Sequence, residues 1–179
     1  KTHKAIYGES GSGKTTLSAA AKSKDGRVPF FFFTEKGNGV LTPFGQQLGN
    51  WENFLKMRDI VLGPKREEAI NKFSCLVMDV GGDLDEWAAR YTAKQNKVSY
   101  IGDLEHGKGW SFHETTFKEG LEPLFAFMPV IITAHVNEKK ILWNGEKVDA
   151  MAPALSKRFL KYVHGKVAFI MYLQAPNKK

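Results

Sequence analysis

The residues Gly8-Glu9-Ser10-Gly11-Ser12-Gly13-Lys14-Thr15 decide the fold, because they match the P-loop pattern G-x-x-x-x-G-K-[ST]. Glycine has no Cβ, so the three glycines let the chain wrap tightly and direct backbone N–H groups inward. Residues 4–7, before the loop, are predicted to form a short strand, and residues 16–22, after it, are rich in helix formers. This order of strand, loop and helix is the one that the motif requires.

The same loop indicates a site for a nucleoside triphosphate and Mg²⁺. Backbone N–H groups at a helix N-terminus, a lysine and a metal ion can together neutralise closely spaced phosphates. Lys14 can reach the β- and γ-phosphates, and the Thr15 hydroxyl can bind Mg²⁺. We expect nucleotide contacts from Gly8, Glu9, Ser10, Gly11, Ser12, Gly13, Lys14, Thr15 and Thr16. ATP is favoured over GTP, since the chain has no Asn-Lys-x-Asp segment to read guanine.

Composition predicts one globular domain over residues 1–179, since 42% of the 179 residues are hydrophobic. The formal charge of +7 favours an anionic partner such as nucleic acid, although a basic surface without a partner has the same charge. A single cysteine, Cys75, excludes an internal disulfide framework and is expected to be buried. No apolar run approaches the roughly 20 residues that span a bilayer. No signal peptide is visible, so we expect a soluble cytoplasmic protein without a membrane partner.

Short apolar runs alternate with helical patterns along the chain. The runs at residues 28–33, 74–78, 129–133 and 166–173 predict buried parallel strands. Helices are expected at residues 50–57, 65–72, 84–95, 111–127 and 153–163. The alternation predicts an α/β fold with a mostly parallel central sheet flanked by helices. The Gly-rich residues 37–49 and 97–109 are predicted to be long loops.

A β-hairpin is predicted near residues 138–148, where Asn144-Gly145 separates two extended runs. It carries Lys139, Lys140, Trp143 and Lys147. Lysines beside an aromatic ring suit single-stranded DNA, because cations follow the phosphates and the ring stacks on bases. A solvated hairpin with an incidental tryptophan explains the same residues.

Asp79 is the predicted second metal-site residue. It ends the apolar run Cys75-Leu-Val-Met, the Walker B pattern, and is expected to hold Mg²⁺ through the water shell of the ion. Asp83 and Asp85 follow it and could assist. Asp85 is equally well explained as an acid favoured by a helix dipole.

Glu35 and His135 each follow a predicted strand, so we expect both at the ligand-binding edge of the sheet. Glu35 can polarise a water aimed at the γ-phosphate, or it can pair with Lys36. His135 can sense the γ-phosphate by hydrogen bonding, or it can be structural. His106 and His113 lack the spacing of metal ligands, so no zinc site is predicted.

The order of these parts resembles the RecA-like ATPase core. The P-loop is followed by a strand ending at Glu35, the Walker B strand, a strand ending at Ala134-His135-Val136 and a final helix and strand. Within that group the chain most resembles the small phage-encoded Sak-type ATPases, which are grouped with single-strand annealing proteins and recombinases. The resemblance implies that Lys14, Glu35 and His135 are catalytic. Glu35 would activate water, and His135, standing where Gln is usual, would link the γ-phosphate to a DNA-binding loop at residues 136–152.

The resemblance also implies a homo-oligomer, a ring or a filament, in the phage or bacterial cytosol. ATP would lie at the subunit interface, and a neighbouring copy would supply a basic residue. The candidates for that residue are Lys157, Arg158, Lys161 and Lys166.

Three functions share these residues. The first is a Mg²⁺-dependent ATPase that acts on single-stranded DNA in recombination or annealing. The second is a nucleotide or small-molecule kinase, which also uses a P-loop, although residues 97–109 contain no arginine for a lid over the acceptor. The third is an assembly protein that ATP switches without DNA binding.

Overall fold

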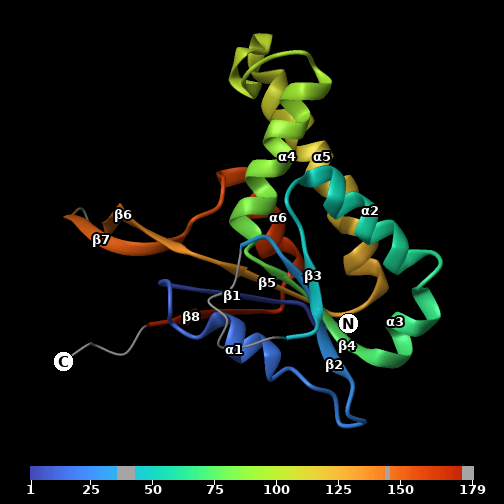
Figure 1. Cartoon of the computed structure of the whole chain (residues 1–179). Helices are drawn as coiled ribbons and strands as arrows, with labels where there is room; N and C mark the ends of the chain where they lie inside the picture. Colours follow the sequence, from blue (N-terminus) through green and yellow to red (C-terminus); the bar gives the residue numbers. More distant parts are fainter. Residues whose placement is uncertain (36–42, 144–145, 175–179) are drawn as a thin grey trace.

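The centre of the molecule is a six-stranded β-sheet, shown in the computed structural model of the chain (Figure 1). The structure describes residues 1–35, 43–143 and 146–174, and only the backbone of residues 140–143, 146 and 148. The strands of the sheet are β1 (Lys4–Gly8), β2 (Val28–Phe33), β3 (Gly45–Gln47), β4 (Phe73–Asp79), β5 (Val130–Ala134) and β8 (Phe169–Leu173). The α-helices are α1 (Lys14–Ala19), α2 (Trp51–Leu62), α3 (Arg66–Lys72), α4 (Gly81–Gln95), α5 (Lys108–Phe127) and α6 (Lys157–Lys166).

The strands lie in the order β3-β2-β4-β5-β1-β8, and every neighbouring pair is parallel. β5 is buried along its whole length, and β4 along nearly all of it. Since helices keep water away from both faces, these strands are continuously apolar rather than alternating. The predicted α/β fold with a mostly parallel sheet is confirmed.

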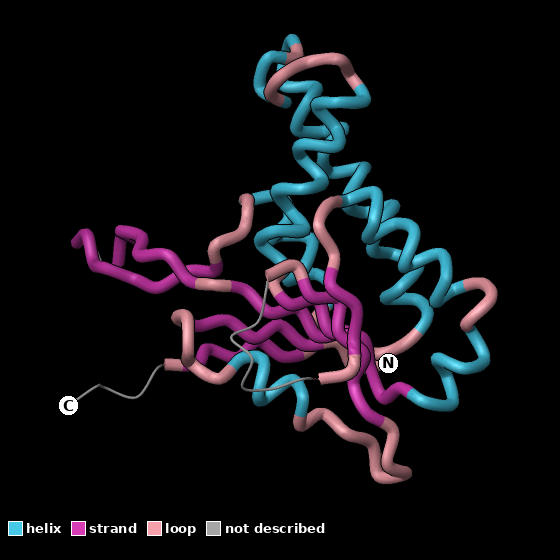
Figure 2. The backbone as a smooth tube through the Cα atoms, viewed as in Figure 1, coloured by secondary structure: helices cyan, strands magenta, loops and turns pink. Residues whose placement is uncertain are grey.

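The two faces of the sheet are covered unequally (Figure 2). α1 packs on one face, against a small apolar cluster that includes Phe31 and Cys75. Helices α2 to α6 pack on the other face, against a larger cluster that includes Phe32 and Leu76. Successive strand side chains point to opposite faces, which is why Phe31 and Phe32 fall in different clusters. The predicted burial of Cys75 is confirmed, and burial raises the pKa of its thiol.

The predicted hairpin is present and longer than expected. β6 (Val136–Trp143) and β7 (Glu146–Pro153) pair antiparallel from Val136↔Pro153 to Trp143↔Glu146. The Asn144-Gly145 turn itself lies outside the described residues. β6 begins two residues after β5 ends, so the hairpin extends directly from the carboxyl end of a central strand (Figure 1).

Several predicted boundaries are wrong. Residues 37–49, expected to be a loop, contain the short strand β3, while residues 36–42 lie outside the described part. Residues 97–109 contain two 3₁₀ turns, η1 (Ile101–Asp103) and η2 (Glu105–Gly107), and then the start of α5. Local periodicity misses such short elements because a turn of three residues has no repeat to detect.

The last helix and strand are both displaced along the chain from their predicted positions. Pro153 was expected to open the helix but instead ends β7, and Ser156 caps α6 by accepting the N–H of Phe159. α6 then runs to Lys166, so the last strand starts at Phe169 rather than at residue 166. The prediction that this strand is buried is also wrong, because β8 lies at the edge of the sheet and none of its residues is buried. A proline occurs both at the start of a helix and at the end of a strand, whereas a serine cap marks only the start of a helix. Ser156 was therefore the more specific signal for the start of α6.

Among the described residues, no helix has both the length and the apolar character that crossing a membrane requires.

Candidate nucleotide-binding site

The P-loop joins β1 to α1 and has the backbone shape that its glycines allow. Gly11 has φ 77° and Gly13 has φ 91°, values in the left-handed region that other residues rarely adopt. Gly8 is required for a different reason, since a Cβ there would lie 2.1 Å from the carbonyl oxygen of Leu173 in β8. The loop can therefore turn back over the N-terminus of α1, where backbone N–H groups can face an anion.

Lys14 is buried at the base of this loop, with only 6% of its surface exposed. Its Nζ donates to the backbone oxygens of Gly8 at 2.9 Å and of Glu9 at 2.8 Å. Burial lowers the pKa of Lys14, while the carboxylates of Asp79 and Glu35 act in the opposite direction. A cation whose partners among the described residues are two carbonyl oxygens can exchange them for phosphate oxygens, which share a negative charge.

Thr15 and Asp79, the two predicted metal residues, are in contact. The Thr15 hydroxyl donates to Asp79 Oδ2 at 2.8 Å, and the Thr133 hydroxyl donates to Asp79 Oδ1 at 2.6 Å. Asp79 is 7% exposed and Thr133 is fully buried in β5. The two hydroxyls fix the orientation of the carboxylate next to the P-loop.

The sheet order explains why residues far apart in sequence meet here. Gly8, Glu35, Asp79 and His135 lie at or just beyond the carboxyl ends of β1, β2, β4 and β5. These four strands are parallel and contiguous in the order β2-β4-β5-β1, so all four ends meet at one edge of the sheet. Open α/β sheets bind their ligands at this edge.

Glu35 and His135 form a pair across the end of β4. The distance between His135 Nε2 and Glu35 Oε1 is 3.1 Å, although the residues are 100 positions apart. Their side chains are 35% and 51% exposed for His135 and Glu35, so solvent reaches both. The carboxylate is thus held near the P-loop lysine, where its charge opposes the lowering of the Lys14 pKa by burial, and it remains open to water.

Thr34 ties the ends of β2 and β4 together. Its backbone N–H donates to the oxygen of Asp79 at 2.8 Å, and its hydroxyl accepts the N–H of Val80 at 2.8 Å. The same hydroxyl donates to Asp83 Oδ2 at 2.6 Å. Asp83 therefore holds Thr34 in place, and Thr34 in turn positions its neighbour Glu35 and the end of β4 at Asp79.

The sequence reasoning missed Thr34 and Thr133 as site residues. The available signal was a hydroxyl side chain within or next to an apolar strand, since a buried polar group needs a partner. That signal does not name the partner, which depends on which strands become neighbours.

Asp85, expected either near the metal or as a helix acid, has a different role. Its Oδ2 accepts the Ser156 N–H at 2.6 Å, and its Oδ1 accepts the Ser156 hydroxyl at 3.0 Å. His113 Nε2 lies 3.0 Å from the same Oδ1. Both carboxylate oxygens are used, so Asp85 joins α4 to α5 and to the start of α6 instead of assisting the metal.

The residues present fit a magnesium nucleotide. Among the described residues no group of three or more His, Cys, Asp or Glu could hold a metal by itself. Mg²⁺ does not need such a group, because it is commonly bound through one or two protein oxygens together with phosphates and water. The buried Ser12 Oγ, which has no hydrogen-bond partner in the described structure, lies inside the loop that would receive those phosphates.

The other predicted loop residues have the exposure that ligand access requires. Glu9, Ser10, Gly11 and Thr16 are exposed, and Ser12 and Gly13 are half-buried. Their contacts with nucleotide stay a prediction.

The predicted DNA-binding residues lie on the hairpin, apart from the P-loop. Lys139 and Lys147 are exposed on β6 and β7. The side chains of Lys140 and Trp143 lie outside the described part of the chain.

Two of the four cations predicted to act on a neighbouring copy are paired within the chain. Arg158 contacts Glu114 and Lys166 contacts Glu122. Assembly of several copies stays a prediction.

Comparison with known protein families finds a match to a family described as the AAA domain, and the match covers residues 1–179. No curated protein is similar enough in sequence to count as a match.

Proposed function

The chain belongs to the AAA domain family of P-loop ATPase-like proteins, and from this premise we propose that it is a Mg²⁺-dependent ATPase acting on single-stranded DNA. The observation that carries the ATPase part is the meeting of three groups at one sheet edge. Lys14, the Thr15–Asp79 pair and the Glu35–His135 pair all lie there. No smaller subset would suffice, because hydrolysis needs phosphate binding, metal binding and an oriented water together.

Lys14 and the N–H groups of the P-loop bind the phosphates in this proposal. The lysine leaves the carbonyl oxygens of Gly8 and Glu9, which are its partners in the described structure. Thr15 and Asp79 would hold Mg²⁺, which when bound neutralises charge on the phosphates. Because Thr133 fixes Asp79, the carboxylate needs little rearrangement to receive the ion or its water shell.

Glu35 orients the attacking water and accepts its proton. A carboxylate that is half exposed beside a buried cation can reach water. His135 holds this carboxylate by one hydrogen bond, so the two side chains act as a unit.

His135 also connects the nucleotide to the hairpin. It is the single residue between the last residue of β5, Ala134, and the first of β6, Val136. A change in the Glu35–His135 contact on nucleotide binding therefore acts directly on the first residue of β6. This connection supports a RecA-like arrangement, in which nucleotide state controls a DNA-binding element.

The hairpin supplies the DNA contact in the proposal. Lys139 and Lys147 are exposed on its two strands, and the chain has a formal charge of +7. Exposed lysines on a projecting ribbon follow a phosphate backbone without reading its sequence. The cellular role proposed for such an activity is single-strand annealing or recombination.

The test is ATP turnover at saturating Mg²⁺ with and without single-stranded DNA. We expect turnover in wild type, stimulation by DNA, and loss of turnover in Glu35→Gln with nucleotide binding retained. Glu105→Gln is the matched control, because Glu105 is an exposed glutamate in η2. Absence of turnover in wild type contradicts the ATPase, whereas turnover without stimulation contradicts only the DNA part.

A further inference from the structure

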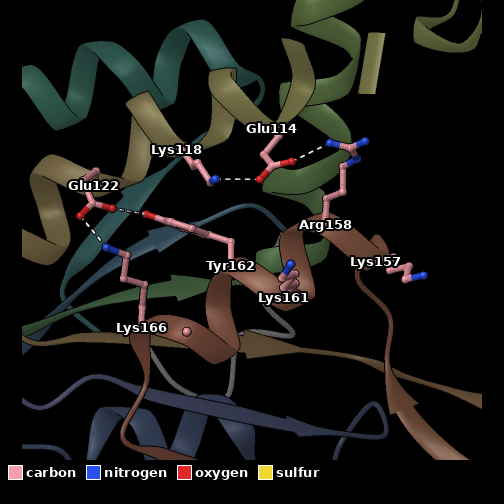
Figure 3. A pocket seen from close by; sticks show the side chains of 9 residues that line it. Glu114, Lys118, Glu122, Lys157, Arg158, Lys161, Tyr162 and Lys166 are labelled. Carbon is pink, nitrogen blue, oxygen red and sulfur yellow. Dashed lines mark hydrogen bonds and ion pairs between the residues drawn. The ribbon is translucent and has the colours of Figure 1, made fainter. Parts of the chain in front are cut away.

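A second group of charged residues lies in a groove between α5 and α6, away from the P-loop (Figure 3). The groove has a volume of about 860 Å³, and five cations and two carboxylates line it, for a formal charge of +3. α5 and α6 pack on the face of the sheet opposite α1. The groove therefore does not belong to the nucleotide site.

The first carboxylate, Glu114, is occupied by two partners. Lys118 Nζ lies 2.7 Å from its Oε1, and Arg158 lies 2.6 Å from its Oε2. Hydrogen bonds from Lys118 and then from Arg158 hold the pKa of Glu114 below its usual value. This carboxylate stays ionised and shared between two cations at neutral pH.

The second carboxylate, Glu122, is occupied in the same way. Lys166 Nζ lies 2.5 Å from its Oε1, and the Tyr162 hydroxyl donates to its Oε2 at 3.0 Å. The Lys166 hydrogen bond is the main cause that lowers the pKa of Glu122. Tyr162 is buried and engaged, so its ring is not available to stack on a ligand.

Lys157 and Lys161 remain as cations without an ionic partner among the described residues. Both are exposed, and in Figure 3 no dashed line joins either of them to another side chain. Four positions apart on α6, they lie on the same helix face about 6 Å apart. Gly165, one turn further, has open space where a side chain would stand. The row of two cations therefore continues into a part of the groove that no side chain blocks.

We propose that this groove binds the phosphodiester backbone of single-stranded nucleic acid, with Lys157 and Lys161 as its direct contacts. The proposal rests on the proposed function and extends it, since it adds a backbone site to the hairpin. Lys157 begins α6 four residues after Pro153 ends β7, so the groove starts near the base of the hairpin.

The chemistry of the groove favours a phosphodiester over an acidic peptide. A phosphodiester backbone has one negative charge for each nucleotide. Two lysines one helical turn apart can therefore contact phosphates in any register of the strand. An acidic peptide would need carboxylates at matching positions. The described residues that line the groove offer no available aromatic ring and no side-chain amide to a base, so we expect binding that is independent of sequence.

The test measures binding of a fluorescent oligothymidylate by anisotropy, without nucleotide, over a series of salt concentrations. The variant is Lys157→Ala with Lys161→Ala. Two lost phosphate contacts should reduce the slope of log K against log salt by about 1.4, and the affinity roughly 10- to 30-fold near 0.1 M salt. The matched control is Lys22→Ala with Lys24→Ala, which removes two exposed lysines just beyond α1 on the opposite face. The control should change both the salt slope and the affinity less than the groove variant does.

Three outcomes overturn the proposal. The first is a groove variant that binds oligothymidylate like wild type, because the lysines then serve another ligand, such as the nucleotide of a neighbouring copy. The second is an equal loss in groove and control variants, which shows a general effect of charge. The third is polyglutamate binding that falls in the groove variant while oligothymidylate binding does not.

A hairpin variant, Lys139→Ala with Lys147→Ala, separates this proposal from the proposed function. If wild type binds DNA and only the hairpin variant weakens it, the function stands and the groove site fails. If wild type binds no oligothymidylate, the DNA part of both fails, while ATP turnover still reports on the P-loop site.

Discussion

Lysines and carboxylates lie close together in two regions of the molecule, the sheet edge beside the P-loop, here called the nucleotide edge, and the groove between α5 and α6. The side chains of the two regions differ in how deeply they are buried. At the nucleotide edge Lys14 and Asp79 are 6% and 7% exposed, and their partners are backbone oxygens and hydroxyls. In the groove Glu114 and Lys166 are 31% and 32% exposed, and their partners are mostly opposite charges. Buried charges must be fully satisfied at fixed positions, whereas exposed pairs contribute little and exchange readily.

This difference in burial predicts which substitutions will have the largest effects on activity and stability. Removing a buried charge at the nucleotide edge leaves its partners without an alternative, because water cannot replace it. Removing a charge in the groove lets water and neighbouring cations compensate. The expected effects therefore decrease from the P-loop to the groove.

The largest effect is expected for Lys14→Ala. The substitution removes the only P-loop cation, and turnover should fall by about 10² to 10³, with weaker nucleotide affinity. Steady-state turnover and calorimetry with ATP measure both. Lys22→Ala, an exposed lysine just beyond α1, is the control and should behave like wild type. Full activity in Lys14→Ala would remove the role assigned to this lysine.

Asp79→Asn should lose turnover on the order of 100-fold while some nucleotide binding remains. The amide keeps the size of the carboxylate and can still accept from Thr15 or Thr133, but it lacks the charge that attracts Mg²⁺. Turnover measured over a series of Mg²⁺ concentrations checks this. An unchanged dependence on Mg²⁺ would show that the ion is held elsewhere.

Asp85→Ala tests whether burial alone makes a charge matter. It leaves the N–H and hydroxyl of Ser156 without their acceptor, while His113 Nε2 keeps only the backbone oxygen of residue 85, so the free energy of unfolding should fall by about 2–4 kcal/mol. Urea denaturation measures the loss. Asp149→Ala, an exposed aspartate on β7, should stay within about 0.5 kcal/mol of wild type. Equal stability of both variants would mean that the buried contacts contribute nothing.

His135→Ala should have a smaller effect, because the Glu35–His135 pair is partly exposed. The loss of one such hydrogen bond, worth about 1 kcal/mol, corresponds to roughly a fivefold change in turnover. His135→Gln retains a side-chain donor toward Glu35 and should recover most of it. Turnover with and without single-stranded DNA checks both variants. Identical turnover in His135→Ala, His135→Gln and wild type would show that Glu35 and His135 do not act as a unit.

Glu114→Gln should have the smallest effect. The pKa of Glu114 is lowered in the folded protein, so its charged pairs stabilise the fold above the usual pKa of a glutamate. That contribution is lost as the pH falls through the folded value, and screening keeps it below about 1 kcal/mol. Urea denaturation at neutral and acidic pH should therefore show a small difference from wild type that vanishes in acid. A difference that grew in acid would reverse the sign of the linkage, and Glu105→Gln controls for the substitution itself.

The P-loop and the main strands could be predicted because their causes are local. Gly11 and Gly13 adopt the left-handed backbone that a non-glycine residue avoids, and Lys14 follows them at a fixed spacing. β2 and β4 are apolar runs because helices cover both faces of the sheet. Backbone sterics and burial act on residues that are neighbours in the chain, so the sequence carries them directly.

The positions of Glu35, Asp79 and His135 could be predicted only as strand ends. No single segment of the sequence indicates which strands become neighbours in the sheet. The order β2-β4-β5-β1 brings these three residues together. The roles of Thr133 and Asp85 depend on this order too, because each finds its partner on another element.

The P-loop, the α/β class, the burial of Cys75 and the hairpin follow from the amino-acid sequence alone, since each depends on spacing, backbone conformation or apolar pattern within one segment. Packing of separate elements sets the Glu35–His135 pair, the support of Asp79 by Thr133 and the groove in which Lys157 and Lys161 have no ionic partner among the described residues. The physical reason is that these contacts join residues from separate elements, and their free energy depends on distances that only the packed sheet and helices set.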